Sequence, residues 1–209
     1  DFLDPQELLY IRAFPKIAHI PAILTIRRFL DGGTFKGGEG SRITLFARGL
    51  AFADTEPLNN FAYLDLESDV QAPSLEEAAQ AFNIGIIRSL HSIKAPIKDI
   101  AAKIRDIRRT DEEIVKIAYK ADSLTDVTAL FKQAQQFNGQ NIPIAMGKYG
   151  IPSRILAAKL HSPIVYTMPR EYIAKYHLEQ EYIDPITLSD LYHFRTIHEN
   201  TAIYGVIGT

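Results

Sequence analysis

The chain has 209 residues, of which 46% are apolar and 23% charged, so it can bury one substantial core and is not expected to be disordered. The formal net charge is −2, which provides no basic surface for nucleic acid and favours a small or anionic metabolite as the ligand. There is no cysteine, which excludes disulfides and thiolate chemistry and agrees with a cytoplasmic location. No apolar run reaches the roughly 18 residues of a membrane span, so no membrane partner is expected.

Apolar segments of strand length alternate with amphipathic segments along the chain. Such segments are typical of parallel strands that are buried on both faces. Six strands are predicted, at residues 22–27, 62–67, 83–91, 114–120, 141–147 and 163–168. The segments between them carry helix start signals. These signals are Ser74 with Glu77, Pro96, Ser123 with Asp126, and Thr187 with Asp190.

Alternating strands and helices predict an α/β fold with a parallel sheet, either an open doubly wound sheet or a closed eight-stranded barrel. The glycines after the first strand, at positions 32, 33, 37 and 38, lack the spacing and the following helix start of a nucleotide-binding loop. A TIM-type (β/α)8 barrel is therefore favoured.

Polar residues sit at the ends of the predicted strands or within them. In a barrel the carboxyl ends of all strands meet at one face, where active sites are built. A buried charge costs several kcal/mol unless it is paired, so repeated polar insertions indicate a shared cavity. The polar residues are Arg27, Asp65, Glu67, His91 and Lys116. Met146 and Gly147 close the fifth predicted strand.

Lys116 lies inside the apolar strand 114–120, where water is scarce. Desolvation lowers the pKa of a lysine, and a nucleophilic amine needs a drop from ~10.4 to ~7–8, a preference of roughly 4 kcal/mol for the neutral form. The alternative is a structural lysine that reaches from the strand end to pair with Asp65 or Glu67. Both interpretations remain open at this point.

His91 ends the third predicted strand, on what should be the same face. A satisfied core or surface imidazole is the commoner case, but a histidine beside an imine-forming lysine is a coherent acid/base pair. The other histidines show no metal-ligand spacing, so no metal site is predicted.

Three motifs occur in order along the chain. They are Ser89-Leu90-His91, then Lys116-Ile117-Ala118 followed by Ser123 and Asp126, then residues 146–155 with the sequence MGKYGIPSRI. Together they resemble the ordered signature of type I 3-dehydroquinate dehydratases. Residues 24–27 with Gly32-Gly33, and residues 63–67, are similar to the third and fourth strands of that family. The resemblance covers nearly the whole chain.

The resemblance implies dehydration of 3-dehydroquinate to 3-dehydroshikimate in the shikimate pathway, without a metal or an organic cofactor. It makes Lys116 the Schiff-base lysine and His91 the acid/base, with Asp31 where many members carry a glutamate that orients this histidine. Arg154 would hold the substrate carboxylate. The remaining substrate-binding set would be Arg27, Met146, Tyr166, Gln180, Asp65 and Glu67.

Simpler roles stand beside these assignments. Met146 and Tyr166 are also compatible with plain core packing, Arg28 is the alternative to Arg27 as the inward-facing residue, and Arg154 is also compatible with pairing to an acid on a helix surface.

The chain also departs from the family pattern. Asp31 is one methylene shorter than glutamate, and residues 176–180 differ from the usual lid, so the alignment of Gln180 is insecure. The barrel should lack its first one to two strands, which precede residue 22 in the family. Residues 192–208 resemble a junction with a shikimate dehydrogenase, so we expect a barrel at residues 1–198 and the start of a second domain at 199–209. Covalent fusion to that dehydrogenase and a homodimer are the expected partner arrangements.

Two rival functions remain. A class I aldolase would use the same lysine but usually binds phosphate at the last two strands, and residues 163–170 contain no glycine-rich phosphate loop. A degenerate barrel that supports a following dehydrogenase would need no catalysis, because a fold does not by itself establish a function.

Overall fold

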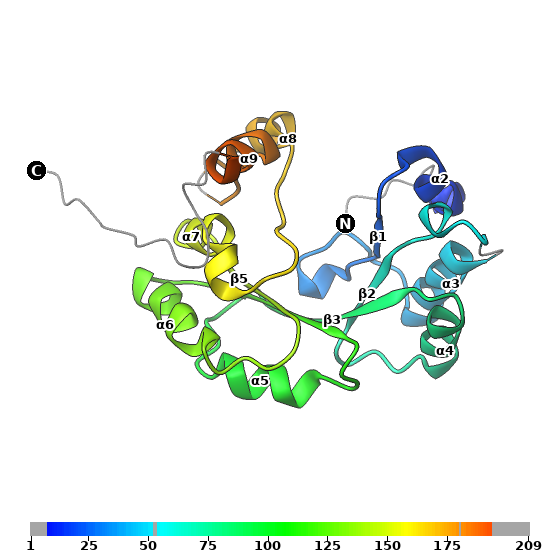
Figure 1. Ribbon diagram of the computed structural model, residues 1–209, viewed down its shortest axis with the longest axis horizontal. Coiled ribbons are helices and arrows are strands. Elements are labelled where there is room, and N and C mark those ends of the chain that lie inside the picture. Colours follow the sequence, from blue (N-terminus) through cyan, green and yellow to red (C-terminus); the bar gives the residue numbers. More distant parts are fainter. Residues whose placement is uncertain (1–7, 52–53, 180, 194–209) are drawn as a thin grey trace, which may run out of the picture. The chain divides into compact units, whose positions relative to one another are not determined.

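The computed structural model describes residues 8–51, 54–179 and 181–193. It shows an α/β protein in which parallel strands alternate with helices, as the sequence predicts (Figure 1). The strands hydrogen-bond in chain order, β1-β2-β3-β4-β5. Their bounds are β1 Ile23–Thr25, β2 Tyr63–Glu67, β3 Gly85–Ser92, β4 Ile114–Lys120 and β5 Asn141–Met146.

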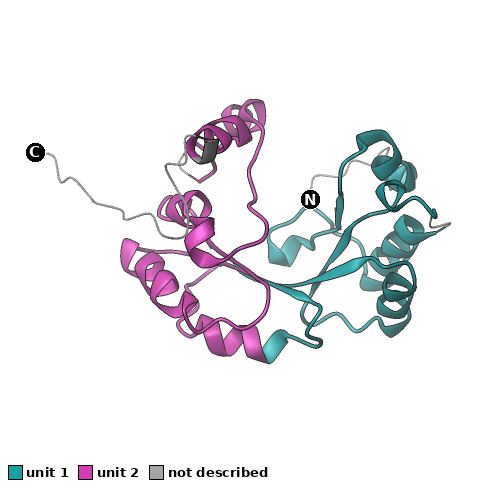
Figure 2. Cartoon of the chain, viewed as in Figure 1, with its two compact units in different colours: residues 1–93, 106–116 teal, residues 94–105, 117–209 magenta. Residues whose placement is uncertain are grey.

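The chain forms two compact units (Figure 2). Unit 1 comprises residues 1–93 and 106–116, and unit 2 comprises residues 94–105 and 117–209. Strand β4 therefore begins in unit 1 and ends in unit 2.

Unit 1 contains β1, β2 and β3, which pair in parallel with Thr25 opposite Asp65 and Glu67 opposite Ser89. Successive side chains of a strand point to opposite faces of the sheet. Its helical segments are η1 Ile11–Ala13, α2 Phe14–Ala18, η2 Phe29–Asp31, α3 Glu39–Leu50, η3 Pro57–Asn59 and α4 Pro73–Ala81.

The core of unit 1 lies between one face of this sheet and helices α3 and α4. Leu24, Leu64 and Leu66 supply the strand side of the core, and Phe46 and Leu75 supply the helix side. Burial of these side chains is the main force that holds the helices on the sheet, at about 1.5–3 kcal/mol for each large apolar side chain. The other face of the sheet is left for polar side chains.

Unit 2 continues the alternation. Strand β5 follows α6, and the short helix α7 begins after residues 147–150, which form the turn that follows β5. The helical segments of this part of the chain are α5 Ile100–Ile107, which ends in unit 1, α6 Leu124–Ala134, α7 Ile151–Ile155, η4 Ala157–Leu160, α8 Arg170–Tyr176 and α9 Pro185–His193.

The helix start signals were correct at one helix and misplaced at three. Ser123 and Asp126 form the predicted capping box: the Ser123 hydroxyl accepts from the Asp126 backbone N–H, and the Asp126 carboxylate accepts from the Ser123 N–H at 2.9 Å. Helix α4 instead begins at Pro73, so the predicted cap Ser74 lies inside the first turn and makes no capping bond.

Aspartates open the other two helices. Helix α5 begins at Ile100 rather than near Pro96, and the Asp99 carboxylate accepts from the Ala102 N–H at 2.8 Å. Helix α9 begins at Pro185, with the Asp184 carboxylate accepting from the Thr187 N–H at 3.0 Å, so Thr187 is inside the helix rather than at its cap. An aspartate carboxylate accepts hydrogen bonds from the free N–H groups of a first turn more favourably than a threonine hydroxyl does, and the proline side chain has no acceptor.

The predicted strand at residues 163–168 is wrong. The segment belongs to no strand or helix, and its carbonyls accept hydrogen bonds from side chains instead. The Ser162 hydroxyl donates to the Ile164 carbonyl at 2.8 Å, and the Arg154 guanidinium donates to the Tyr166 carbonyl at 3.0 Å. An apolar run of this length looks the same in a strand and in an extended loop, and only its hydrogen-bond partners distinguish the two.

The predicted second-domain start at residues 199–209 lies outside the described residues. Among the residues that are described, no helix is both long and apolar enough to cross a membrane.

We predict that Ser123→Ala lowers the free energy of unfolding by about 1 kcal/mol, because it removes the side-chain acceptor of the α6 cap. Ser74→Ala is the matched control, since Ser74 is exposed and caps nothing in α4. Urea unfolding followed by circular dichroism measures both. An equal loss in the two variants, or none at Ser123, would contradict the cap assignment.

Candidate active site

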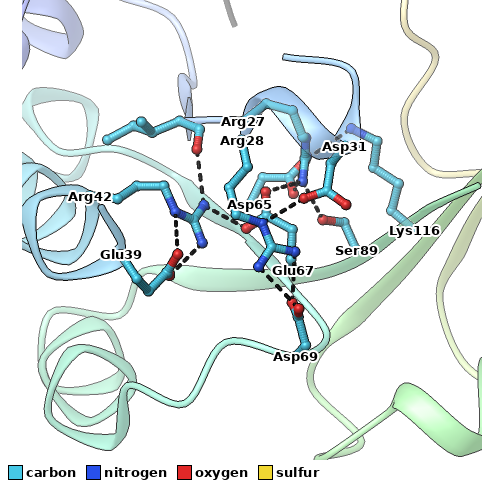
Figure 3. A network of polar contacts seen from close by, with 11 residues as sticks. Arg27, Arg28, Asp31, Glu39, Arg42, Asp65, Glu67, Asp69, Ser89 and Lys116 are labelled. Carbon is cyan, nitrogen blue, oxygen red and sulfur yellow. Dashed lines mark hydrogen bonds and ion pairs between the residues drawn. The ribbon is translucent and has the colours of Figure 1, made fainter. Parts of the chain in front are cut away.

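A cluster of charged side chains occupies the sheet face opposite α3 and α4 in unit 1 (Figure 3). Because Leu64 and Leu66 point toward the helices, Asp65 and Glu67 between and after them must point to the other face. The register then places Ser89 of β3 beside Glu67. Arg27 and Lys116 reach the same cluster from the end of β1 and from β4.

Arg27 binds both carboxylates of β2. Its Nη2 donates to Asp65 Oδ1 at 2.7 Å, and its Nη1 donates to Glu67 Oε1 at 2.8 Å and to Ser89 Oγ at 2.9 Å. Arg27 is only 3% exposed. The structure therefore resolves one open alternative: Arg27, and not Arg28, enters this cluster.

Gly33 lets the loop after β1 fold back against Arg27. A Cβ atom at this position would lie 2.3 Å from the Arg27 carbonyl oxygen, closer than any side chain can approach backbone. The Gly33 and Phe35 N–H groups donate to the carbonyls of Arg28 and Arg27 at 3.0 and 3.2 Å. The glycine thus helps to fix the backbone that carries the arginine.

Lys116 is buried and forms an ion pair with Asp65, whose Oδ2 lies 2.9 Å from the Lys116 Nζ. The structural pairing that the sequence allowed is thus present. Burial on its own would raise the pKa of Asp65, but the positive charges of Lys116 and Arg27 outweigh it and hold that pKa well below its ordinary value. Asp65 is therefore a fixed anion between two cations.

His91 lies on the same face of β3 as Ser89, two residues away. Burial and the positive charges of Arg27 and Lys116 lower the pKa of His91 from 6.5 to about 2, against the opposing effect of Asp65. Its Nδ1 atom is buried and has no hydrogen-bond partner among the described residues. The imidazole is therefore neutral, and one of its ring nitrogens carries no proton, as a proton acceptor requires.

Asp31 does not hold His91 in this structure. Its carboxylate accepts from Arg28 Nε at 2.6 Å, and the two Nη atoms of Arg28 bind Asp69 at 3.0 and 2.9 Å. The physical reason is local, because Arg28 lies three residues before Asp31 and its Nε reaches the short carboxylate while its two Nη atoms bind Asp69. The expected contact from Asp31 to His91 is not formed, and a catalytic role for Asp31 stays a prediction.

Arg154 belongs to unit 2 and is 5% exposed. Its guanidinium donates to the Tyr166 carbonyl and lies 4.5 Å from the centroid of the Tyr182 ring. Burial lowers the pKa of Arg154, and its Nε is buried without a hydrogen-bond partner among the described residues. Among the described residues it forms no ion pair with a helix-surface acid, although the charge of Glu181 acts to raise its pKa. It is a buried cation with donor capacity left for an anion.

The other predicted residues of unit 2 are Met146, Tyr166 and Gln180. Met146 is the last residue of β5 and is partly buried, as is Tyr166, while Gln180 lies outside the described residues. Where β4 and β5 end, unit 2 has a pocket of about 730 Å³. It is lined by residues 120–122, residues 147–149, His177, Glu179 and Glu181. Carboxyl ends of strands are where a site is expected in this fold.

Arg42 was missed by the sequence analysis. It lies on α3, is 1% exposed, and donates from Nη1 to Glu67 Oε2 at 2.6 Å and to the Ile26 carbonyl at 2.9 Å. A signal existed, because Arg42, Phe46 and Gly49 follow the spacing of a buried helix stripe. An arginine on such a stripe must be paired inside the protein.

No group of three histidine, aspartate or glutamate side chains in the described part of the chain is arranged to hold a metal ion. The described carboxylates of the charged cluster in unit 1, Asp65 and Glu67, are instead paired with arginine and lysine.

Fold and site together define an α/β protein of the TIM-barrel type with a buried lysine and a neutral histidine on one face of a parallel sheet. Residues 3–196 match the family described as Type I 3-dehydroquinase. The chain belongs to this family.

Two curated relatives show how the match is distributed. The bifunctional 3-dehydroquinate dehydratase/shikimate dehydrogenase of Arabidopsis thaliana is 26% identical over 210 residues, covering 98% of this chain and 33% of that protein. The 3-dehydroquinate dehydratase of Archaeoglobus fulgidus is 37% identical over 145 residues, covering 69% of this chain and 67% of that protein. The chain thus spans a third of the first relative and two thirds of the second.

Solved structures show the same fold. A 3-dehydroquinate dehydratase from Geobacillus kaustophilus has a TM-score of 0.73 at 18% identity, covering 92% of this chain and 76% of that chain. The enzyme from Aquifex aeolicus has a TM-score of 0.67 at 26% identity, covering 90% and 80%. The predicted fold class is confirmed.

We predict that the His91 imidazole stays neutral from about pH 8 to about pH 5, below the range in which an ordinary histidine titrates. The unfolded chain takes up this proton near pH 6.5 and the folded protein does not, so His91 should make the free energy of unfolding decrease as the pH falls from 6.5 toward 2. Nitrogen NMR of histidine-labelled protein, with His91→Gln for assignment, measures the titration. A midpoint near pH 6.5 would refute the neutral-base assignment.

Proposed function

We propose that this protein dehydrates 3-dehydroquinate to 3-dehydroshikimate through a Schiff base on Lys116. The observation that carries the proposal is the placement of a buried lysine and a neutral histidine on one face of the sheet, within a chain of the type I family. Two charged groups set that placement, since Asp65 binds the lysine and Arg27 binds Asp65.

The first step needs the neutral amine of Lys116. The Lys116 ammonium gives up one proton, the resulting amine attacks the ketone carbon of the substrate, and the carbonyl oxygen takes up that proton and one hydrogen of the amine and leaves as water, which gives a protonated imine. The positive charge of the lysine is thereby kept at the same nitrogen, beside Asp65, at 2.9 Å in the free protein. The carboxylate that pairs with the ammonium is suited to stabilise the iminium that replaces it.

His91 then moves the proton. Its available nitrogen accepts a proton from the carbon beside the imine, and the electron pair of that C–H bond neutralises the iminium to an enamine. The charge of Lys116 is one cause of the low pKa of His91, so the imidazole becomes more basic at the step in which that charge disappears. The imidazolium next donates its proton to the hydroxyl on the following carbon, which leaves as water, and hydrolysis of the imine releases the product.

Arg154 is assigned to the substrate carboxylate. A buried guanidinium with an unpartnered Nε offers the planar donor pair that a carboxylate prefers. Arg27 has its fork engaged by Asp65 and Glu67, so a contact to substrate hydroxyls would use its remaining N–H groups. Met146 and Tyr166 are assigned to the wall of the site and Gln180 to its lid.

Residues 199–209 are proposed to begin a shikimate dehydrogenase domain. The Arabidopsis relative is bifunctional and is matched over 98% of this chain. The coding sequence downstream of Thr209 tests this directly, and a stop codon there would refute it.

We predict that borohydride reduction in the presence of 3-dehydroquinate fixes substrate mass on the peptide that contains Lys116. Lys116→Met should abolish the adduct, while Lys120→Met, at the exposed end of the same strand, should retain it. Peptide mass spectrometry measures the adduct, and circular dichroism checks that each variant is folded. No adduct in folded wild-type protein would favour a non-catalytic barrel, and an adduct with phosphorylated aldehydes alone would indicate an aldolase.

We predict that His91→Ala still forms the imine but loses turnover by roughly 10²–10⁴-fold, the usual contribution of a positioned acid/base group. His161→Asn is the control, because His161 is exposed and asparagine tolerates its backbone φ of 52°. Steady-state assays give turnover, and borohydride trapping gives the imine. Wild-type turnover in His91→Ala would remove His91 from the mechanism.

A further inference from the structure

A continuous line of alternating charges crosses unit 1 from helix α3 to Lys116 (Figure 3). Each side chain touches the next through an ion pair of 2.6–2.9 Å. In order, the side chains are Glu39, Arg42, Glu67, Arg27, Asp65 and Lys116.

All members of this line except Glu39 are buried. Their side chains are at most 7% exposed, whereas that of Glu39 is 44% exposed. Solvent screens buried charges poorly, so the charges in this cluster must be compensated by one another. The protonation state of any titratable member is then set by the sum of the others.

The buried members are neutral in total when Lys116 is uncharged. Asp65 and Glu67 supply two negative charges, and Arg27 and Arg42, which stay protonated in proteins, supply two positive charges. A proton on Lys116 adds a third buried cation to two buried anions. Glu39 lies at the exposed end of the line and is screened by solvent.

Among the described residues, His91 of β3 interacts with the same Asp65 carboxylate as Lys116, and it is neutral, so it does not change this sum. Arg28 lies further out and is compensated by Asp31 and Asp69.

We propose that Arg42 is a positioning residue that favours the uncharged amine of Lys116, by supplying the second cation that the two buried carboxylates require. Without Arg42, Asp65 and Glu67 would share one guanidinium, and the cluster would be neutral only with Lys116 protonated. The catalytic use of this amine rests on the function proposed above, but the charge relation does not.

The shape of Arg42 suits this task. One nitrogen reaches Glu67 and the Ile26 carbonyl, while Nε and Nη2 bind the two oxygens of Glu39 at 3.2 and 2.7 Å. The guanidinium is therefore held at both ends, from the helix and from the strand, next to Glu67. A lysine would keep the charge and lose the fork.

The test is the pH titration of the Lys116 Cε signal by carbon NMR in lysine-labelled protein, assigned with Lys116→Met, without substrate. Arg42→Met should move the titration midpoint upward by about one pH unit or more, because a compensating cation is lost. Arg48→Met, which changes an exposed arginine of the same helix, should leave it in place. Arg42→Lys, which keeps the charge, should stay near the wild-type midpoint.

Two further variants separate charge from structure. Glu67→Gln removes an anion and should move the midpoint downward, and Arg42→Met/Glu67→Gln restores neutrality and should return it toward wild type. If Arg42→Met does not fold, Glu67→Gln still tests the charge relation through its expected downward shift. An unchanged midpoint in Arg42→Met, or an upward shift in Glu67→Gln, would overturn the proposal. Borohydride trapping in the same samples reports the imine separately: a shifted midpoint with no imine refutes only the proposed function, and an imine with no shift refutes only the role of Arg42.

Discussion

The carboxylate of Asp65 is the contact on which the site of unit 1 depends. One oxygen binds Arg27 from the end of β1 and the other binds Lys116 of β4, so a single buried anion ties three segments of the sheet together. Removing one partner from a buried pair leaves an uncompensated charge and costs about 3–5 kcal/mol. The parallel register that sets Thr25 opposite Asp65 is therefore a requirement of the site as well as of the sheet.

The two faces of this sheet have different tasks. One face carries Leu24, Leu64 and Leu66 against the helices and provides the burial that stabilises unit 1. The other face carries Asp65 and Glu67, whose charges would destabilise the fold if they were not paired. Arg42 joins the two, because it starts on α3 and ends at Glu67. The chemistry of the site is in this way connected to the packing of a helix that carries none of the reacting groups.

Electrostatic interactions also determine the order of the steps in the proposed reaction. His91 is neutral because burial and two neighbouring cations oppose its protonation. It can hold a proton favourably only when one of those cations loses its charge, which is what enamine formation does at Lys116. The proton transfer to His91 and the loss of charge at the imine on Lys116 are then coupled, because the two groups interact electrostatically. The pairing of Asp31 with Arg28 leaves the buried nitrogen of His91 available for this exchange.

The sequence by itself determined the alternation of strands and helices, the capping box at Ser123, and the polar ends that single out Lys116 and His91. These features follow from the spacing of residues that are close in the sequence, so local conformation is sufficient to predict them. Only the tertiary structure decided that Arg27 rather than Arg28 enters the cluster, that Asp65 is the partner of Lys116, and that residues 163–168 join no strand. The contacts of Arg27 and Lys116 join residues 38 to 62 positions apart, so they depend on strand register, which no local pattern specifies.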